Sequence, residues 1–163
     1  FHGHSVPSHD IADHVMQRLR FDHKTREDVR TLILYHDSEI APTHKTVRRW
    51  LSKIGESNFK KLLAVKLADI KAHTKGTQQP RIDKCLALYS ILDDVIAQGQ
   101  CFSMKDLAIG GKEIISLGVP EGKLIGDILR HILDKVISGD LPNEMNPQML
   151  AAQQYLSENY FKF

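Results

Sequence analysis

The chain has 163 residues, 42% of them hydrophobic and 26% charged, which is the composition of an ordinary globular protein rather than of a disordered one. The formal net charge of +2 is too small to establish nucleic-acid binding, so a basic surface must come from local clustering of Lys and Arg. No apolar run reaches the roughly 18 residues of a membrane-spanning helix. Cys85 and Cys101 lack the spacing of a metal knuckle, so we expect a reduced, cytoplasmic setting.

Apolar residues recur at helical spacing along the chain and form no alternating strand pattern, which predicts an all-α fold. In the first half we expect helices over 8–19, 25–35, 43–54 and 57–73. Gly55 separates the last two, at a position that favours a left-handed helix end. The segment 74–80 contains glycine and proline and is the best linker candidate. We therefore predict two domains, 1–75 and 81–163.

The second half continues the helical pattern. A long helix is expected over 81–98, followed by two short helices between Ser103 and Gly118. The strongest helix should begin at Pro120 and end at Gly139, because apolar residues occur at every turn of this segment. A last helix should run toward Tyr160. The sequence thus predicts an all-α, multi-helical bundle of seven to eight helices in two packed lobes.

Histidines and aspartates on several of these helices suggest a metal site. Imidazole and carboxylate groups can hold a cation that polarises a phosphate and lowers the pKa of bound water, as in metal-dependent phosphohydrolases of the HD superfamily. The candidates are His4, His36, Asp37, Asp69 and His73. They could form a complete set with His4 or His9 as its first member, or the later half of a site whose first ligands lie upstream.

Simpler interpretations exist for the same side chains. His36 falls on the apolar stripe of its helix, so it could be a core histidine bonded to a backbone carbonyl. Asp69 could cap a helix or pair with a lysine. We retain His4, His36 and Asp69 as the candidate metal ligands.

An ordered series of motifs gives the sequence a family resemblance. It begins with Phe1-His2-Gly3-His4, Arg18-Leu19-Arg20-Phe21 and Tyr35-His36-Asp37, and it continues through the segments 46–55, 66–72, 102–111, 117–126 and 139–143. In this order they resemble the C-terminal part of bacterial tRNA nucleotidyltransferases, the CCA-adding enzymes of the poly(A) polymerase family. The resemblance covers nearly the whole chain.

This resemblance implies a parent enzyme that adds C, C and A to tRNA 3′ ends, using CTP, ATP and Mg²⁺. It implies that 1–75 is the latter half of an HD-like helical domain and 81–163 a helical, RNA-binding tail, with tRNA as the partner. The paired metal-binding aspartates of a catalytic head do not occur, and the chain starts at Phe1 without methionine. We therefore expect a missing N-terminal catalytic head, and we assign no catalytic residue to the chain.

A-form RNA is recognised mostly through its shape and its phosphates, so a tRNA-binding surface needs clustered cations. The first candidate cluster lies on one short helix beside Trp50 and consists of Lys45, Arg48, Arg49 and Lys53. Helical spacing places Lys45, Arg49 and Lys53 one turn apart from one another. The alternative interpretation is a solvated helix face without a partner.

The second candidate cluster is a glycine-containing turn between two helices. Gly118 and Gly122 could let the backbone approach a phosphate, and Lys123, Lys112 and Arg130 could supply positive charge. The alternative is that the glycines let two helices pack closely.

Three functions remain open from the sequence. The first is the tRNA-binding body and tail of a CCA-adding enzyme. The second is an HD-superfamily metal-dependent phosphohydrolase, with a divalent metal at the partial HD site. The third is an interaction lobe that forms a homodimer through the apolar helix between Leu124 and Ile137.

Overall fold

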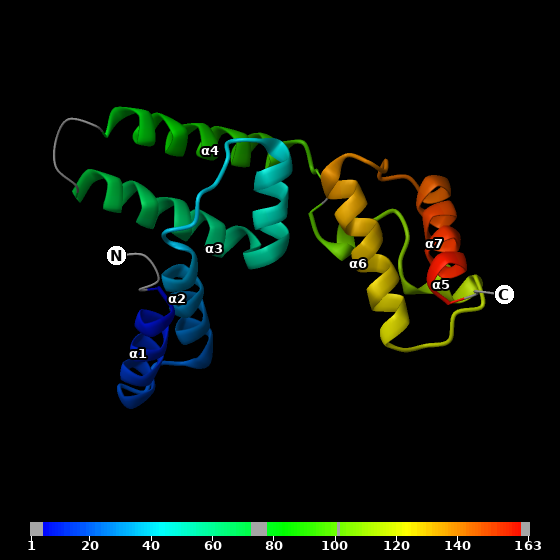
Figure 1. Ribbon diagram of the computed structural model, residues 1–163, viewed down its shortest axis with the longest axis horizontal. Helices are drawn as coiled ribbons and strands as arrows, with labels where there is room; N and C mark the ends of the chain where they lie inside the picture. Colours follow the sequence, from blue (N-terminus) through cyan, green and yellow to red (C-terminus); the bar gives the residue numbers. More distant parts are fainter. Residues whose placement is uncertain (1–4, 73–77, 101, 161–163) are drawn as a thin grey trace. The chain divides into compact units, whose positions relative to one another are not determined.

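The computed structural model describes residues 5–72, 78–100 and 102–160 of the chain (Figure 1). Within these residues the chain forms seven α-helices, one short 3-10 helix (η1) and no strand. The elements are α1 (Ser5–Arg18), α2 (His23–Tyr35), α3 (His44–Ala72), α4 (Gln79–Ala97), η1 (Met104–Asp106), α5 (Gly111–Ser116), α6 (Lys123–Ser138) and α7 (Met145–Asn159). The prediction of an all-α, multi-helical fold is confirmed.

The chain divides into two compact units, Phe1–Asp94 and Val95–Phe163, with the division inside α4. This differs from the expected domains 1–75 and 81–163. The early part of α4 belongs to the first unit because it packs on α3, where the Cys85 thiol donates to the Leu63 carbonyl oxygen at 3.6 Å. Most of the expected linker, residues 74–77, lies outside the described residues.

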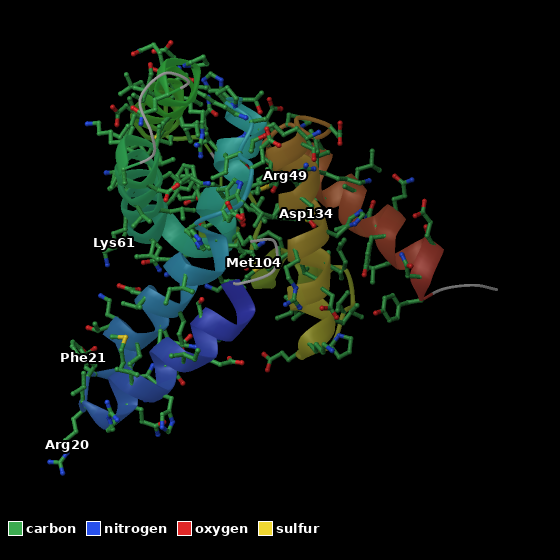
Figure 2. All side chains as sticks on the ribbon, turned by 60° about the vertical axis from the view of Figure 1, so that its left-hand side comes forward. Arg20, Phe21, Arg49, Lys61, Met104 and Asp134 are labelled. Atoms are coloured by element: carbon green, nitrogen blue, oxygen red, sulfur yellow. The ribbon has the colours of Figure 1, made fainter. Side chains whose placement is uncertain are left out.

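In the first unit, α1 and α2 lie side by side and are joined by a tight turn. Asp22 caps α2, because its carboxylate accepts a hydrogen bond from the Thr25 backbone N–H at 2.9 Å. The Arg26 guanidinium donates two hydrogen bonds to the Asp13 carboxylate, at 2.9 and 3.0 Å, and so ties α2 to α1. Arg20 and Phe21 lie at the exposed tip of this helical hairpin (Figure 2).

The third helix bends at Gly55. This glycine has a φ of 77°, as a glycine-terminated helix requires, but its ψ of 161° is not that of a left-handed cap. The chain resumes a helical conformation at once after the kink, so the two helices expected over 43–54 and 57–73 are present as two segments that meet at Gly55 under the single label α3. Both halves contribute to the core, which includes Val47, Leu51, Phe59, Leu62, Leu63 and Ile70.

The core of the second unit forms around α6. Its buried face packs against α5 and α7 and consists of Ile128, Ile132, Leu133, Val136 and Ile137. Gly139 ends the helix in a left-handed conformation, as predicted, with φ 82° and ψ 8°. The helix begins at Lys123 rather than at Pro120, because the non-helical Gly122 (φ 152°) precedes it. The apolar face of this helix, which we considered above for a homodimer, packs largely within the unit.

One fully buried polar side chain holds three segments of the second unit together. The Gln148 side-chain carbonyl oxygen accepts a hydrogen bond from the Ile109 backbone N–H at 3.2 Å. Its amide nitrogen donates to the Asn143 side-chain oxygen at 2.7 Å, and Asn143 in turn donates to the Asp106 carbonyl oxygen at 2.8 Å. A buried amide contributes to stability only while each partner remains bonded.

We therefore predict that Gln148→Leu lowers the free energy of unfolding by about 1–3 kcal/mol, because it leaves the buried Ile109 N–H without an acceptor. Chemical denaturation followed by far-ultraviolet circular dichroism measures this loss. The matched control is Gln153→Leu on the exposed side of α7, which should change stability by less than about 0.5 kcal/mol. Equal effects of the two substitutions would contradict the prediction.

Candidate nucleic-acid interface

The first half of α3 presents a row of cations. Lys45, Arg49 and Lys53 are exposed and follow one another at intervals of four residues, so they lie along one side of the helix (Figure 2 labels Arg49). Arg48 is half-buried and stands beside this row rather than in it. We call Lys45, Arg49 and Lys53 the basic ridge. The structure thus places on one side of α3 the three cations that their spacing in the sequence had assigned to one helix face.

Aromatic rings anchor the ridge to the core. The Trp50 ring meets the Tyr35 ring of α2 edge-on, with centroids 5.2 Å apart at 83°, and it stacks on Phe59 at 6.3 Å and 17°. The Lys53 ammonium lies 4.2 Å from the Tyr35 ring centroid and 5.2 Å from that of Trp50. Such cation–π contacts fix the position of the charge without neutralising it. The sequence had suggested Trp50 as an anchor, but it did not indicate that Tyr35 and Phe59 would pack against Trp50.

The second cluster lies in the second unit, around the turn that precedes α6. Gly118 and Gly122 have φ values of 85° and 152°, and a Cβ atom added to either would meet nothing within 4 Å. The two glycines are therefore needed for backbone conformation and not for close helix packing, and the space in front of them is open. Lys112 and Lys123 are exposed on the flanking helices.

Exposed Glu121 lies in the turn itself, and two further carboxylates near it are bonded to neighbouring groups. The Arg130 guanidinium is paired with the Asp127 carboxylate one turn earlier on α6, so Arg130 is the weakest cation of the predicted set. The Glu113 carboxylate accepts a hydrogen bond from the Gly110 N–H at 2.7 Å at the start of α5, and this bond lowers the pKa of Glu113. The amides of α6, rather than those of α5, are thus the ones that could face an anion.

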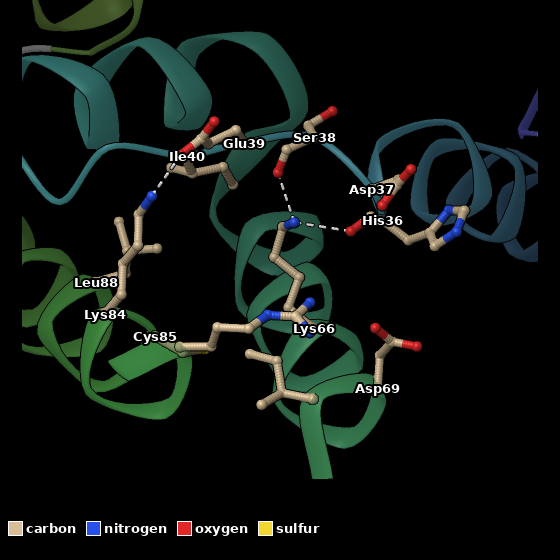
Figure 3. A pocket seen from close by; sticks show the side chains of 12 residues that line it. His36, Asp37, Ser38, Glu39, Ile40, Lys66, Asp69, Lys84, Cys85 and Leu88 are labelled. Atoms are coloured by element: carbon tan, nitrogen blue, oxygen red, sulfur yellow. Dashed lines mark hydrogen bonds and ion pairs between the residues drawn. The ribbon is translucent and has the colours of Figure 1, made fainter. Parts of the chain in front are cut away.

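A cavity of about 290 Å³ lies in the first unit where the predicted HD-like residues meet (Figure 3). His36, Asp37 and Asp69 line it, together with residues of the segment between α2 and α3 and of α4. The Lys66 ammonium donates to the backbone carbonyl oxygens of His36 and Ser38, at 2.7 and 2.6 Å. Burial lowers the pKa of Lys66, and the nearby Asp37 and Asp69 carboxylates partly oppose this shift.

The described residues of this cavity do not by themselves form a set of divalent-metal ligands. The His36 Nδ1 atom lies 2.7 Å from the Ile33 carbonyl oxygen, which is the contact expected of a core histidine. In the part of the chain that the structure describes, no three His, Cys, Asp or Glu side chains are placed so that they could hold a metal ion together. A cationic ammonium instead lies near the two aspartates. His4 and His73 lie outside the described residues, so the set of His4, His36 and Asp69 stays a prediction.

A family model described as tRNA nucleotidyltransferase domain 2 matches residues 5–151, which is well over half of the chain. No curated protein matches the chain, and no solved structure does. Within the described residues, no helix is both long enough and apolar enough to cross a membrane.

For the HD-like cavity we predict that Mn²⁺ gives no saturable heat when it is titrated into the chain at micromolar concentrations. The physical reason is that the Lys66 ammonium already interacts with the carboxylates that a divalent cation would need. Isothermal titration calorimetry of the wild-type chain and of His36→Ala makes the comparison. Micromolar binding that is lost in both His36→Ala and Asp69→Ala would contradict this expectation and would support His36 and Asp69 as metal ligands.

Proposed function

The chain belongs to the tRNA nucleotidyltransferase domain 2 family, and from this premise we propose that it is the tRNA-holding body and tail of a CCA-adding enzyme. The observation that carries the proposal is the basic ridge of Lys45, Arg49 and Lys53. Three exposed cations on a helix anchored by Trp50 suit a ligand that offers a row of phosphates. They do not distinguish one base from another, which suits an enzyme that must accept many tRNAs.

In this proposal nucleotidyl transfer belongs to another part of the parent polypeptide. That chemistry needs acidic side chains that hold Mg²⁺ against the nucleoside triphosphate, here CTP or ATP. This chain would instead hold the tRNA so that its 3′ end reaches such a catalytic head. Binding energy used for positioning contributes to the rate as directly as a reacting group does.

The second unit would add contacts of a different kind. Lys112 and Lys123 supply charge, and the open turn at Gly118 and Gly122 lets the first amides of α6 approach a phosphate. Arg130 would contribute less, because its guanidinium is paired with Asp127. The ridge and the turn lie in different units, so each can be tested alone.

To test the ridge we predict that Lys45→Gln and Arg49→Gln each weaken tRNA binding and each reduce the slope of log K against log salt concentration by about one. The slope falls because every lost phosphate contact releases one counterion fewer. Fluorescence anisotropy of labelled tRNA at several salt concentrations measures both quantities. The control is Lys71→Gln, which removes an exposed cation from the other end of α3 and should leave the slope unchanged.

Two outcomes would refute the proposal. One is a wild-type chain that does not bind tRNA even at low salt. The other is a chain that hydrolyses phosphoesters unaided with an added divalent metal, which would favour the HD-superfamily phosphohydrolase. A loss of slope as large in Lys71→Gln as in the ridge variants would show that overall charge, and not the ridge, attracts the RNA.

A further inference from the structure

A second cavity of the first unit lies next to the end of the ridge. It has a volume of about 400 Å³, and α1, α2 and α3 each contribute to its wall. The lining residues on which the argument depends are His9, Glu27, Arg30, Thr31, Tyr35 and Lys53. Lys53 is thus both the last cation of the ridge and part of this wall. The wall holds two cations and one carboxylate, a balance that favours an anion of one negative charge.

Neighbouring side chains hold the Arg30 guanidinium in place. Its Nε donates to the His9 Nε2 atom at 2.9 Å, and one terminal nitrogen, Nη1, donates to the Glu27 carboxylate at 2.7 Å. Glu27 offsets part of the Arg30 charge, as Asp127 does for Arg130, so Lys53 supplies the uncompensated charge of the wall. Because His9 accepts at Nε2, its proton lies on Nδ1, next to the Asp10 carboxylate at 2.9 Å. A guanidinium fixed in this way has lost its conformational entropy before any ligand arrives, which is the condition for a pre-organised anion site.

Lys53 contributes a charge of a different kind. Its ammonium rests on the Tyr35 and Trp50 rings, and no carboxylate lies within salt-bridge distance of it in the described part of the chain. The aromatic faces attract the cation but do not cancel its charge. The ammonium is therefore held at the cavity wall while its charge stays available to an anion.

We propose that this cavity binds one phosphodiester group of bound RNA, with Arg30 and Lys53 as the charged partners and the Thr31 hydroxyl as a neutral hydrogen-bond donor. The proposal rests on the proposed function, since the ridge brings the RNA strand to the cavity. A phosphodiester carries the single negative charge that two cations and one carboxylate leave unbalanced. Inorganic phosphate shares its oxygen chemistry and serves as the simplest probe.

The fluorescence of Trp50 can report binding at this site, because Trp50 is the only tryptophan in the sequence and its ring contacts the Lys53 ammonium. We expect inorganic phosphate and a ribodinucleotide with one phosphodiester to change Trp50 fluorescence saturably, as the anion draws the ammonium from the indole. The dinucleotide should saturate at lower concentration, which separates an RNA group from free phosphate. The response should disappear in Lys53→Met. If neither probe alters the emission, the proposal is overturned.

A second test uses Thr31, which lines the cavity but is not part of the ridge. Thr31→Val keeps the shape of the side chain and removes its hydroxyl, so we expect about tenfold weaker tRNA binding with an unchanged salt slope. Thr31→Ser restores a hydroxyl and should restore most of the affinity. Wild-type affinity in Thr31→Val, with the fold verified by circular dichroism, would overturn the proposal.

The failure of this inference can be told from the failure of the proposed function. If the wild-type chain does not bind tRNA, the proposed function is refuted, whether or not Trp50 fluorescence responds to phosphate or to the dinucleotide. If the wild-type chain binds tRNA, but Thr31→Val binds it equally well and Trp50 fluorescence responds to neither probe, only the proposal of a phosphodiester-binding cavity is refuted. Lys45→Gln is the matched ridge control, because it should weaken tRNA binding yet leave the response of Trp50 to phosphate intact.

Discussion

The packing of Trp50 between Tyr35 and Phe59 is the contact on which the first unit depends. Tyr35 ends α2, Trp50 precedes the Gly55 kink of α3 and Phe59 follows it, so one cluster joins three helical segments. Aromatic side chains bury large areas in fixed geometries, which limits how far the kink can open. The direction in which the ridge faces is therefore set by a core contact and not by the cations themselves.

Much of the fold could be predicted from the sequence because helical periodicity is a local property. The glycines at 55 and 139 were assigned correctly as interruptions, since only glycine adopts their positive φ at little cost. The division of the chain could not be predicted in this way. It depends on the packing of α4 against α3, and the Cys85–Leu63 contact joins residues too far apart in sequence for any local pattern to indicate.

The candidate sites show the same limit. Spacing alone indicated that Lys45, Arg49 and Lys53 would share a helix face. The sequence did not indicate the surroundings of these cations, because the rings that contact the Lys53 ammonium come partly from another helix. The histidine and aspartates of the HD-like cavity were identified by type, whereas Lys66 was not considered, although its ammonium bonds two carbonyl groups there. Histidine and aspartate side chains suggest metal binding by their type, but a nearby cation such as the Lys66 ammonium disfavours a second cation at the same carboxylates.

Gln148 has a consequence for the motions of the second unit. Ile109 belongs to no helix, and amides in such segments normally open to solvent within fluctuations far smaller than unfolding. Its N–H, however, is buried and bonded to a side chain on α7, 39 positions away. That bond ties the loop around Ile109 to α7, so the amide opens only when the loop or the Gln148 side chain moves out of the core. Hydrogen exchange at Ile109 should therefore be slower than at the exposed amides of the same loop, although the backbone around it is not helical.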